Sequence, residues 1–317
     1  MAKNLFLCRS PLQLEIVLNI IKRVSSNDAI ILYVDDEFKE DNHKNFLRFS
    51  SDEVKLIYYH KRNRPLDLLF FIHILDDYDT IYLASVSNTY FQFLISHSSY
   101  NSIVTFDDGT ASLMHDSMIH NSKCSFAKMM FKKMFFIHED NASIISKSSH
   151  HFTIYNFGRY LYKVPYTYVD LFEKPTLTCD KNSDKPEVSI FLGGCYSELV
   201  EALDYESFLI TLSNFIIDLK SENQCVYYIP HPREKCDQRI FSIVNPIYPQ
   251  ELTEYYLLNL LDSYSIVKLY GFGSSVQLNL VRNPRVQVNI LKHTDINNKY
   301  DTELLFSNFE YETIRIG

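Results

Sequence analysis

At 317 residues the chain is long enough for two domains, each with a hydrophobic core of its own. Its 46% hydrophobic and 22% charged residues are typical of a globular protein and exclude an intrinsically disordered one. The formal net charge of −8 argues against nucleic acid as the main partner, because binding to phosphates requires a cationic surface.

The cysteines and the apolar runs indicate the compartment. The six cysteines show neither a CxxC pair nor Cys/His metal spacing, so we interpret them as reduced thiols in a cytosolic protein. The chain enters a predicted strand at once, at Asn4–Cys8, without a signal peptide. No apolar run approaches the roughly 18 residues that are needed to span a bilayer. We therefore expect a soluble intracellular protein.

The first part of the chain alternates apolar strands with helices. This alternation predicts a parallel sheet covered on both faces, which we assign to a first domain over residues 1–172. Ser10 is expected to cap the first helix, with Pro11 in its first turn. The predicted strands are Asn4–Cys8, Ala29–Val34, Val54–Tyr59, Thr80–Ala84 and Ser102–Phe106, and further helices are predicted over Leu66–Leu75 and Thr89–Ile95.

The segment Phe126–Phe136 is apolar and basic at the same time. One interpretation is a helix that lies on a membrane surface or meets a partner helix. The interpretation we favour is a helix packed on the sheet, with the ammonium groups of Lys128, Lys132 and Lys133 reaching to water.

A polar stretch over residues 173–186, bracketed by prolines, is the predicted linker. The alternation of strands and helices then resumes, which predicts a second domain over residues 187–300. The tail, 301–317, shows no clear period, and one course open to it is to cross back to the first domain. The elements predicted after the linker are strands at Val188–Leu192, Val226–Ile229, Ser265–Leu269 and Val286–Ile290, and helices at Phe208–Leu219, Gln250–Leu261 and Ser274–Val281.

Two carboxylates, Asp107 and Asp108, follow a buried strand, and Gly109 allows a sharp turn after them. In open α/β sheets ligands bind outside the carboxyl ends of the strands. A carboxylate pair at that edge is able to act as a general base, to coordinate a metal, or only to cap a solvated turn. We take this stretch as the centre of a candidate site.

His231 comes at the end of a predicted strand, between Pro230 and Pro232, which fix the backbone on either side of the imidazole. A single histidine is more often a packed or a surface residue. At this position, however, an imidazole is suited to hold a phosphate or to donate a proton.

Two glycine turns also follow predicted strands of the second domain. In Gly271-Phe272-Gly273-Ser274-Ser275 the backbone can approach a ligand closely, and two hydroxyl groups stand at a helix N-terminus, where partial positive charge attracts phosphate. The alternative is that Ser274 is a plain N-cap. Gly193-Gly194 is a second tight turn of this kind. A base in one domain and an anion-binding site in the other would suit a nucleotide-sugar glycosyltransferase.

A series of motifs adds to this hypothesis, and their order and spacing fit one family over nearly the whole chain. They are Asn4–Cys8 with Gln13, Ile81–Ser85, Thr105–Thr110, Phe126–Met130, His151–Ile154, Pro230–Arg233 and Phe272–Ser274. With these motifs the chain resembles glycosyltransferase family 52, the bacterial lipooligosaccharide sialyltransferases that use CMP-sialic acid.

The resemblance implies a GT-B fold, with two Rossmann-like parallel-sheet domains that face each other across a cleft. It implies an inverting transfer of sialic acid, without a metal or another cofactor, from CMP-sialic acid to a galactoside of lipooligosaccharide or capsule. An α-2,3 linkage and a homodimer are expected.

The same resemblance implies roles for the residues singled out above. His231, with Pro232 and Arg233, is expected to bind or protonate the donor phosphate. Ser274 and Ser275 are expected to bind the same phosphate, with Gly273, Gly193 and Gly194 beside the nucleotide. Asp107–Gly109 is expected in the acceptor cleft, where it supplies the base.

Two departures from the family pattern leave alternatives open. Some members carry an Asp in the loop that here reads Gly193-Gly194-Cys195-Tyr196-Ser197-Glu198, so the base is either Asp108 or Glu198 and the donor sugar stays open. Some members also begin with a membrane anchor; because none is seen here, we expect any contact with the inner face of the bacterial inner membrane to be peripheral. The rival functions are glucosyl or Kdo transfer on the same fold, and non-catalytic binding of a glycan or nucleotide.

Overall fold

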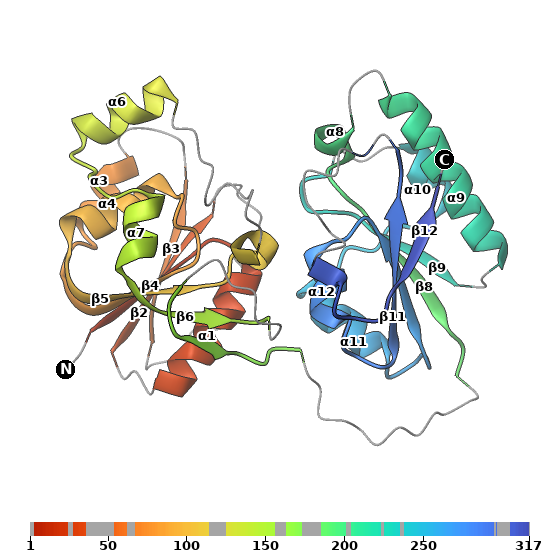
Figure 1. The fold of residues 1–317 in the computed structure, drawn as a ribbon, viewed down its shortest axis with the longest axis horizontal. Coiled ribbons are helices and arrows are strands. Elements are labelled where there is room, and N and C mark those ends of the chain that lie inside the picture. Colours follow the sequence, from red (N-terminus) through yellow and green to blue (C-terminus); the bar gives the residue numbers. More distant parts are fainter. Residues whose placement is uncertain are drawn as a thin grey trace. The chain divides into compact units, whose positions relative to one another are not determined.

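We determined the fold from a computed structural model of the chain, which divides into two compact units, Met1–Leu171 and Phe172–Gly317 (Figure 1). The sequence placed the domain boundary in the linker over 173–186, of which residues 173–184 lie outside the described part. The structure describes residues 3–24, 28–35, 54–61, 67–113, 125–155, 163–172, 185–200, 204–222, 225–234, 238–294, 296 and 305–316.

The first unit is built on a seven-stranded sheet in which every neighbouring pair is parallel, with the order β3-β2-β1-β4-β5-β6-β7. The two strands β1 and β2 are buried along their whole length, because helices cover both faces of a parallel sheet. The strands are β1 (Asn4–Cys8), β2 (Ala29–Asp35), β3 (Val54–His60), β4 (Asp77–Leu83), β5 (Ser99–Phe106), β6 (Ser148–Thr153) and β7 (Tyr166–Tyr168). The helices are α1 (Pro11–Val24), α3 (Asp67–Ile72), α4 (Thr89–His97), the 3-10 helix η1 (Gly109–Leu113), α6 (Phe126–Met134) and α7 (Asn141–Lys147).

The parallel sheet predicted for this part of the chain is confirmed. One helix is shorter than predicted, and two strands on one side of the sheet were not predicted. The predicted helix Leu66–Leu75 is shorter in the structure, where α3 ends at Ile72 and β4 begins at Asp77. The sequence analysis did not predict β6 and β7. Their segments, Ser-Ser-His-His-Phe-Thr and Tyr-Thr-Tyr, lack the continuous apolar run that identifies a central parallel strand.

Helix α6 is oriented differently from our favoured interpretation. None of its residues is buried, and its methionines face outward, while Phe131 and the following Phe135 pack against the core. Two of its lysines turn back to the protein: Lys128 Nζ donates to the Ser87 carbonyl at 3.4 Å and Lys132 Nζ to the Glu139 carbonyl at 3.1 Å. The expectation that the ammonium groups reach to water is therefore wrong for Lys128 and Lys132, because nearby backbone carbonyls accept hydrogen bonds from them.

The second unit is a five-stranded sheet with the order β12-β11-β10-β8-β9, again with only parallel neighbours. Its strands are β8 (Val188–Leu192), β9 (Val226–Ile229), β10 (Val267–Gly271), β11 (Val286–Lys292) and β12 (Glu312–Arg315). Its helices are α8 (Tyr196–Leu199), α9 (Tyr205–Glu222), α10 (Gln238–Ile243), α11 (Thr253–Leu260) and α12 (Ser275–Leu280).

The C-terminal tail belongs to this second unit. Residues 312–315 form β12, which pairs in parallel with β11 from Asn289↔Glu312 to Lys292↔Arg315. We had considered that the tail crosses back to the first domain; these residues do not do so. The pattern of apolar residues did not predict β12, because most residues of this edge strand are exposed and it therefore has no apolar face.

Among the described residues, no helix combines the length and the apolar character that crossing a bilayer would require. In the same part of the chain, Cys8, Cys195 and Cys225 are free thiols.

Candidate functional site

The polar residues of the first unit gather where its strand order reverses. From β1 the sheet grows on one side to β2 and β3, and on the other side to β4 and β5. At such a switch point the connections leave a crevice outside the carboxyl ends of the two central strands, where ligands bind. The segments that follow β1, β4 and β5 all contribute to this place in the sheet.

Asp108 is the centre of the cluster. Gln13 Nε2 donates to its Oδ1 at 2.5 Å, and Ser85 Oγ donates to its Oδ2 at 3.0 Å. Gln13 comes from the first turn of α1, and Ser85 follows β4, so three elements hold one carboxylate. Asp108 is partly exposed, whereas Gln13 and Ser85 are buried. Each carboxylate oxygen has a second lone pair, which leaves Asp108 able to accept a proton from a ligand.

The other carboxylate of the pair, Asp107, is buried completely. Its Oδ1 lies 3.1 Å from His151 Nε2, and its Oδ2 accepts from Thr153 Oγ1 and from the Ile154 N–H, both at 2.7 Å. Asp107 thus ties the end of β5 to β6. Our inclusion of Asp107 among the catalytic candidates is corrected, because a carboxylate enclosed by these donors has no exposed surface for a substrate.

Arg9, which the sequence analysis missed, lies beside the Asp108 cluster. Its backbone N–H donates to Gln13 Oε1 at 2.7 Å and so fixes the orientation of the Gln13 amide. Burial lowers the pKa of the Arg9 guanidinium, and the negative charge of Asp108 acts in the opposite direction. The signal in the sequence was its position directly after β1, at the carboxyl end of a central strand.

The turns of the second unit also lie at a switch point, between β8 and β10. Gly193 follows β8, and a Cβ atom at this position would lie 2.7 Å from the Tyr228 hydroxyl and would overlap Glu234 Oε2. Only glycine lets these side chains come so near the backbone. Gly194 continues the turn, and Tyr196 begins the short helix α8.

His231 follows the neighbouring strand β9, and the contacts of its ring nitrogen Nδ1 define its tautomer. The Arg233 N–H donates to Nδ1 at 3.1 Å, and Cys195 Sγ lies 3.2 Å from the same atom. Since Nδ1 accepts the backbone proton, the neutral ring carries its own proton on Nε2. His231 is therefore set to donate from Nε2.

Glu234 closes the turn that holds His231, and sequence reasoning missed it. Its Oε2 accepts from the His231 N–H at 3.0 Å, its own N–H donates to the His231 carbonyl at 2.8 Å, and its Oε1 accepts from Tyr228 Oη at 2.6 Å. Burial raises the pKa of Glu234, and the hydrogen bonds from Tyr228 and His231 oppose this only in part. The signal was a carboxylate three residues after the histidine, at turn spacing.

Ser274 is the N-cap of α12, the alternative that we weighed for it. Its Oγ accepts the Gln277 N–H at 3.2 Å, and Gln277 Oε1 accepts the N–H groups of Gly273 and Ser274, each at 3.0 Å. Gly273 supports this arrangement with a φ of 82°, in the left-handed region. These backbone donors already have an acceptor. A ligand would therefore contact the Ser274 O–H and the first turn of α12, which begins at Ser275.

The remaining predicted residues are placed as follows. Pro232 and Arg233 are exposed beside His231. Glu198 lies in α8, but its side chain is outside the described part. Asp108 belongs to the first unit and His231 to the second. No group of three or more His, Cys, Asp or Glu side chains suited to hold a metal occurs among the described residues.

Comparison with known sequences decides the family. The sequence model of glycosyltransferase family 52 matches residues 26–295. The chain belongs to glycosyltransferase family 52. The resemblance seen in the motifs is thereby confirmed.

Two curated relatives of this family 52 chain are bacterial. An N-acetyllactosaminide alpha-2,3-sialyltransferase of Haemophilus influenzae is 25% identical over 223 residues, which are 68% of this chain and 65% of the relative. A CMP-N-acetylneuraminate:beta-galactoside alpha-2,3-sialyltransferase of Pasteurella multocida is 25% identical over 229 residues, 71% of this chain and 68% of the relative. The match thus spans just under two thirds of the length of the Haemophilus protein.

Solved structures establish the fold of the family 52 chain. MurG of Acinetobacter baumannii gives a TM-score of 0.50 at 8% identity, and TcCGT1 in complex with UDP gives 0.59 at 9% identity. Each comparison covers 99% of this chain and 86% of the other. With two parallel α/β sheets and these neighbours, the predicted GT-B fold class is confirmed.

Proposed function

We propose that this family 52 chain is a sialyltransferase that moves sialic acid from CMP-sialic acid to a galactoside hydroxyl of a bacterial surface glycan, with an α-2,3 linkage. The observation that carries the proposal is the match to the two relatives, both named as alpha-2,3-sialyltransferases, one of them with CMP-N-acetylneuraminate as its donor. The residue roles rest on the geometry of the two switch points.

In the proposed reaction the acceptor hydroxyl oxygen attacks the anomeric carbon of sialic acid. The bond from that carbon to the CMP phosphate breaks, and its electron pair leaves with CMP. The acceptor proton passes to Asp108, whose second lone pairs and partial exposure support this role. Because the donor is β-linked, a single displacement gives an α product.

The leaving phosphate gains negative charge as this bond breaks. The Nε2 proton of His231 supports a role in stabilising that charge, because the Arg233 N–H occupies Nδ1 and orients the ring. The Ser274 O–H and Ser275 at the start of α12 are proposed as further phosphate contacts, with Gly193, Gly194 and Gly273 beside the nucleotide. In this proposal protein donors take the place of a metal ion. Glu198 remains the alternative base.

A donor screen tests the proposal. The full chain is incubated with lactose and, in turn, CMP-sialic acid, CMP-Kdo and UDP-glucose, and products are read by mass spectrometry and NMR. We expect transfer from CMP-sialic acid alone, with an α-2,3 linkage. Transfer only from UDP-glucose or CMP-Kdo would establish a rival transferase. CMP binding without transfer or donor hydrolysis would indicate a non-catalytic binding protein.

The resemblance also supports a cytoplasmic homodimer that acts on lipooligosaccharide or capsule. Light scattering after size exclusion measures the oligomeric state directly. A monomer at micromolar concentration would contradict this part of the proposal.

A further inference from the structure

Glu234 contacts both of the turns that follow the neighbouring strands β8 and β9. Its Oε2 accepts the His231 N–H at 3.0 Å. The same oxygen lies so close to the backbone of Gly193 that a Cβ atom at this glycine would overlap it. Gly193 follows β8, and His231 follows β9, which pairs with β8 in parallel. One half-buried carboxylate therefore lies between two turns at the same edge of the sheet.

Tyr228 anchors this carboxylate to the hydrophobic core. Its Oη donates to Glu234 Oε1 at 2.6 Å. The ring of Tyr228 is fully buried and is stacked on Phe191 of β8, with ring centroids 5.5 Å apart and planes inclined by 9°. Because protein interiors are close-packed, such a ring has little freedom to move, and its hydroxyl offers the glutamate a fixed partner. Each oxygen of the carboxylate is thus held by a separate hydrogen bond.

The contacts of Glu234 determine where the His231 ring lies. The Glu234 N–H donates to the His231 carbonyl at 2.8 Å, so Glu234 binds both the N–H and the carbonyl of His231. Within the turn closed in this way, the Arg233 N–H donates to His231 Nδ1 at 3.1 Å. The course of the turn therefore fixes the ring and, with it, the direction of Nε2, the atom that we propose for the phosphate.

We propose that Glu234, anchored by Tyr228, is a positioning residue for the CMP phosphate and acts on it through His231. Direct contact is unfavourable, because a carboxylate repels a phosphate and because both of its oxygens already accept hydrogen bonds from the protein. The fully buried Tyr228 hydroxyl then influences the affinity for CMP without touching the nucleotide. The inference rests on the proposed function, since it takes CMP as the ligand beside His231.

Removal of the buried Tyr228 hydroxyl is the first test. Tyr228→Phe deletes the hydrogen bond to Glu234 and keeps a ring that stacks on Phe191. Calorimetric titration of the full chain with CMP should show an affinity about threefold to tenfold lower, the size expected for one hydrogen bond. The matched control is Tyr270→Phe, a buried tyrosine of β10 whose hydroxyl interacts with Ser189, and it should bind CMP like the wild type.

Substitution of the carboxylate itself is the second test. Glu234→Leu removes both acceptors and should weaken CMP binding by about tenfold. Glu234→Gln should recover most of this loss, because the amide oxygen can accept the His231 N–H while the amide NH₂ donates to Tyr228 Oη. The control is Glu206→Leu, which removes the same charge from an exposed site of α9 where Glu206 pairs with Arg239, and it should keep the wild-type affinity.

A double-mutant cycle with His231→Ala shows whether the effect passes through the imidazole. In the His231→Ala background, Tyr228→Phe and Glu234→Leu should each change the CMP affinity by less than about twofold. A general loosening of the second unit would instead weaken binding by the same factor in both backgrounds. Initial rates add a second measurement: Glu234→Leu should lower kcat more than it raises KM for CMP-sialic acid, because the phosphate gains charge in the transition state.

Three outcomes would overturn this inference and leave the proposed function intact. These are wild-type CMP affinity in Tyr228→Phe, equal losses in the two backgrounds of the cycle, and no recovery in Glu234→Gln. Absence of CMP binding by the wild type, or wild-type affinity in His231→Ala, would refute the phosphate contact itself and the inference with it. Unchanged circular dichroism and melting temperature verify folding, and if Glu234→Leu does not fold, Tyr228→Phe and its cycle decide.

Discussion

Asp107 and Asp108 are neighbours in the chain, but their side chains meet opposite surroundings. Successive residues along an extended segment point to opposite sides, so one carboxylate of the pair turns toward β6 while the other turns toward Gln13 and Ser85. The dipeptide therefore carries one buried structural carboxylate and one partly exposed carboxylate. The sequence could place both at a strand end, but it could not say which of them faces the crevice.

The two carboxylates should respond differently to the same substitution. Asp108→Asn should lower turnover by about 10²–10⁴-fold with little change in stability, because it removes the proposed base. Asp107→Asn should lower the free energy of unfolding by about 1.5–3 kcal/mol, because it removes the charge to which Thr153 Oγ1 and the Ile154 N–H donate. Urea denaturation and initial rates measure both. If Asp108→Asn keeps wild-type turnover while Glu198→Gln loses it, Glu198 is the base.

At the scale of elements, the sequence predicted central strands better than edges. The strands β1, β2, β8 and β10 were recognised because burial on both faces demands apolar runs. The polar strand β6 and the edge strand β12 carry no such run, since their pairing is set by backbone hydrogen bonds and by neighbours distant in sequence. The same limit explains why the outward rotation of α6 was missed: its carbonyl partners, Ser87 and Glu139, belong to other segments.

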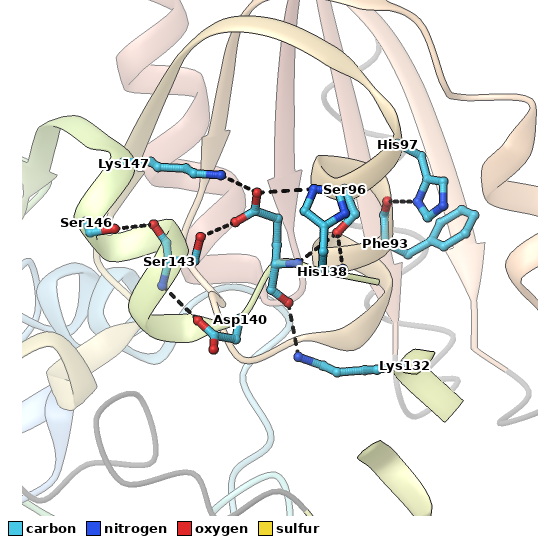
Figure 2. A network of polar contacts seen from close by, with 10 residues as sticks. Phe93, Ser96, His97, Lys132, His138, Asp140, Ser143, Ser146 and Lys147 are labelled. Carbon is cyan, nitrogen blue, oxygen red and sulfur yellow. Dashed lines mark hydrogen bonds and ion pairs between the residues drawn. The ribbon is translucent and has the colours of Figure 1, made fainter. Parts of the chain in front are cut away.

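The carboxylate of Glu139, which precedes α7, forms an ion pair with Lys147 at the end of that helix, and Figure 2 shows Lys147 and Ser143 in this network. Burial raises the pKa of Glu139, but the hydrogen bonds from Lys147 and Ser143 outweigh this effect, and the net pKa lies below its ordinary value of 4.5. Because the folded pKa is depressed, the stabilisation is fully present above pH 4.5 and is lost as the pH falls through the lower, folded value.

Lys147→Met should therefore lower the free energy of unfolding by about 1–2 kcal/mol at pH 7, a modest value because the lysine is half exposed. The difference from the wild type should shrink below pH 4.5, where Glu139 begins to protonate. Lys220→Met is the control, since Lys220 donates to the Ile243 carbonyl and not to a carboxylate. Urea titrations between pH 7 and pH 3.5 measure these differences, and a Lys147→Met effect that is independent of pH would contradict the assignment.

At the scale of the whole molecule, each unit has its polar residues at the switch point of its own sheet. The alternation of strands and helices predicted that Asp108, His231 and Ser274 follow the ends of strands. It could not predict the residues that orient them, Gln13, Glu234 and Gln277, because such contacts depend on side-chain packing across elements. We propose that the base lies in the first unit and the phosphate contacts in the second. Variants of the second unit should therefore weaken CMP binding, whereas variants of the first unit should lower turnover without weakening CMP binding.

CMP should raise the melting temperature of the wild type, since a ligand at 100 times its Kd stabilises the folded state by about 2.7 kcal/mol. His231→Ala should weaken CMP binding by roughly tenfold to a hundredfold, because it removes a hydrogen bond to a charged phosphate, and it should also lower turnover. Gln13→Leu should leave CMP binding unchanged but lower turnover, because Asp108 then loses the donor at its Oδ1. Calorimetric titration with CMP and initial rates with lactose separate the two effects. If His231→Ala binds CMP like the wild type, or if Gln13→Leu loses CMP binding, the roles assigned to the two units are wrong.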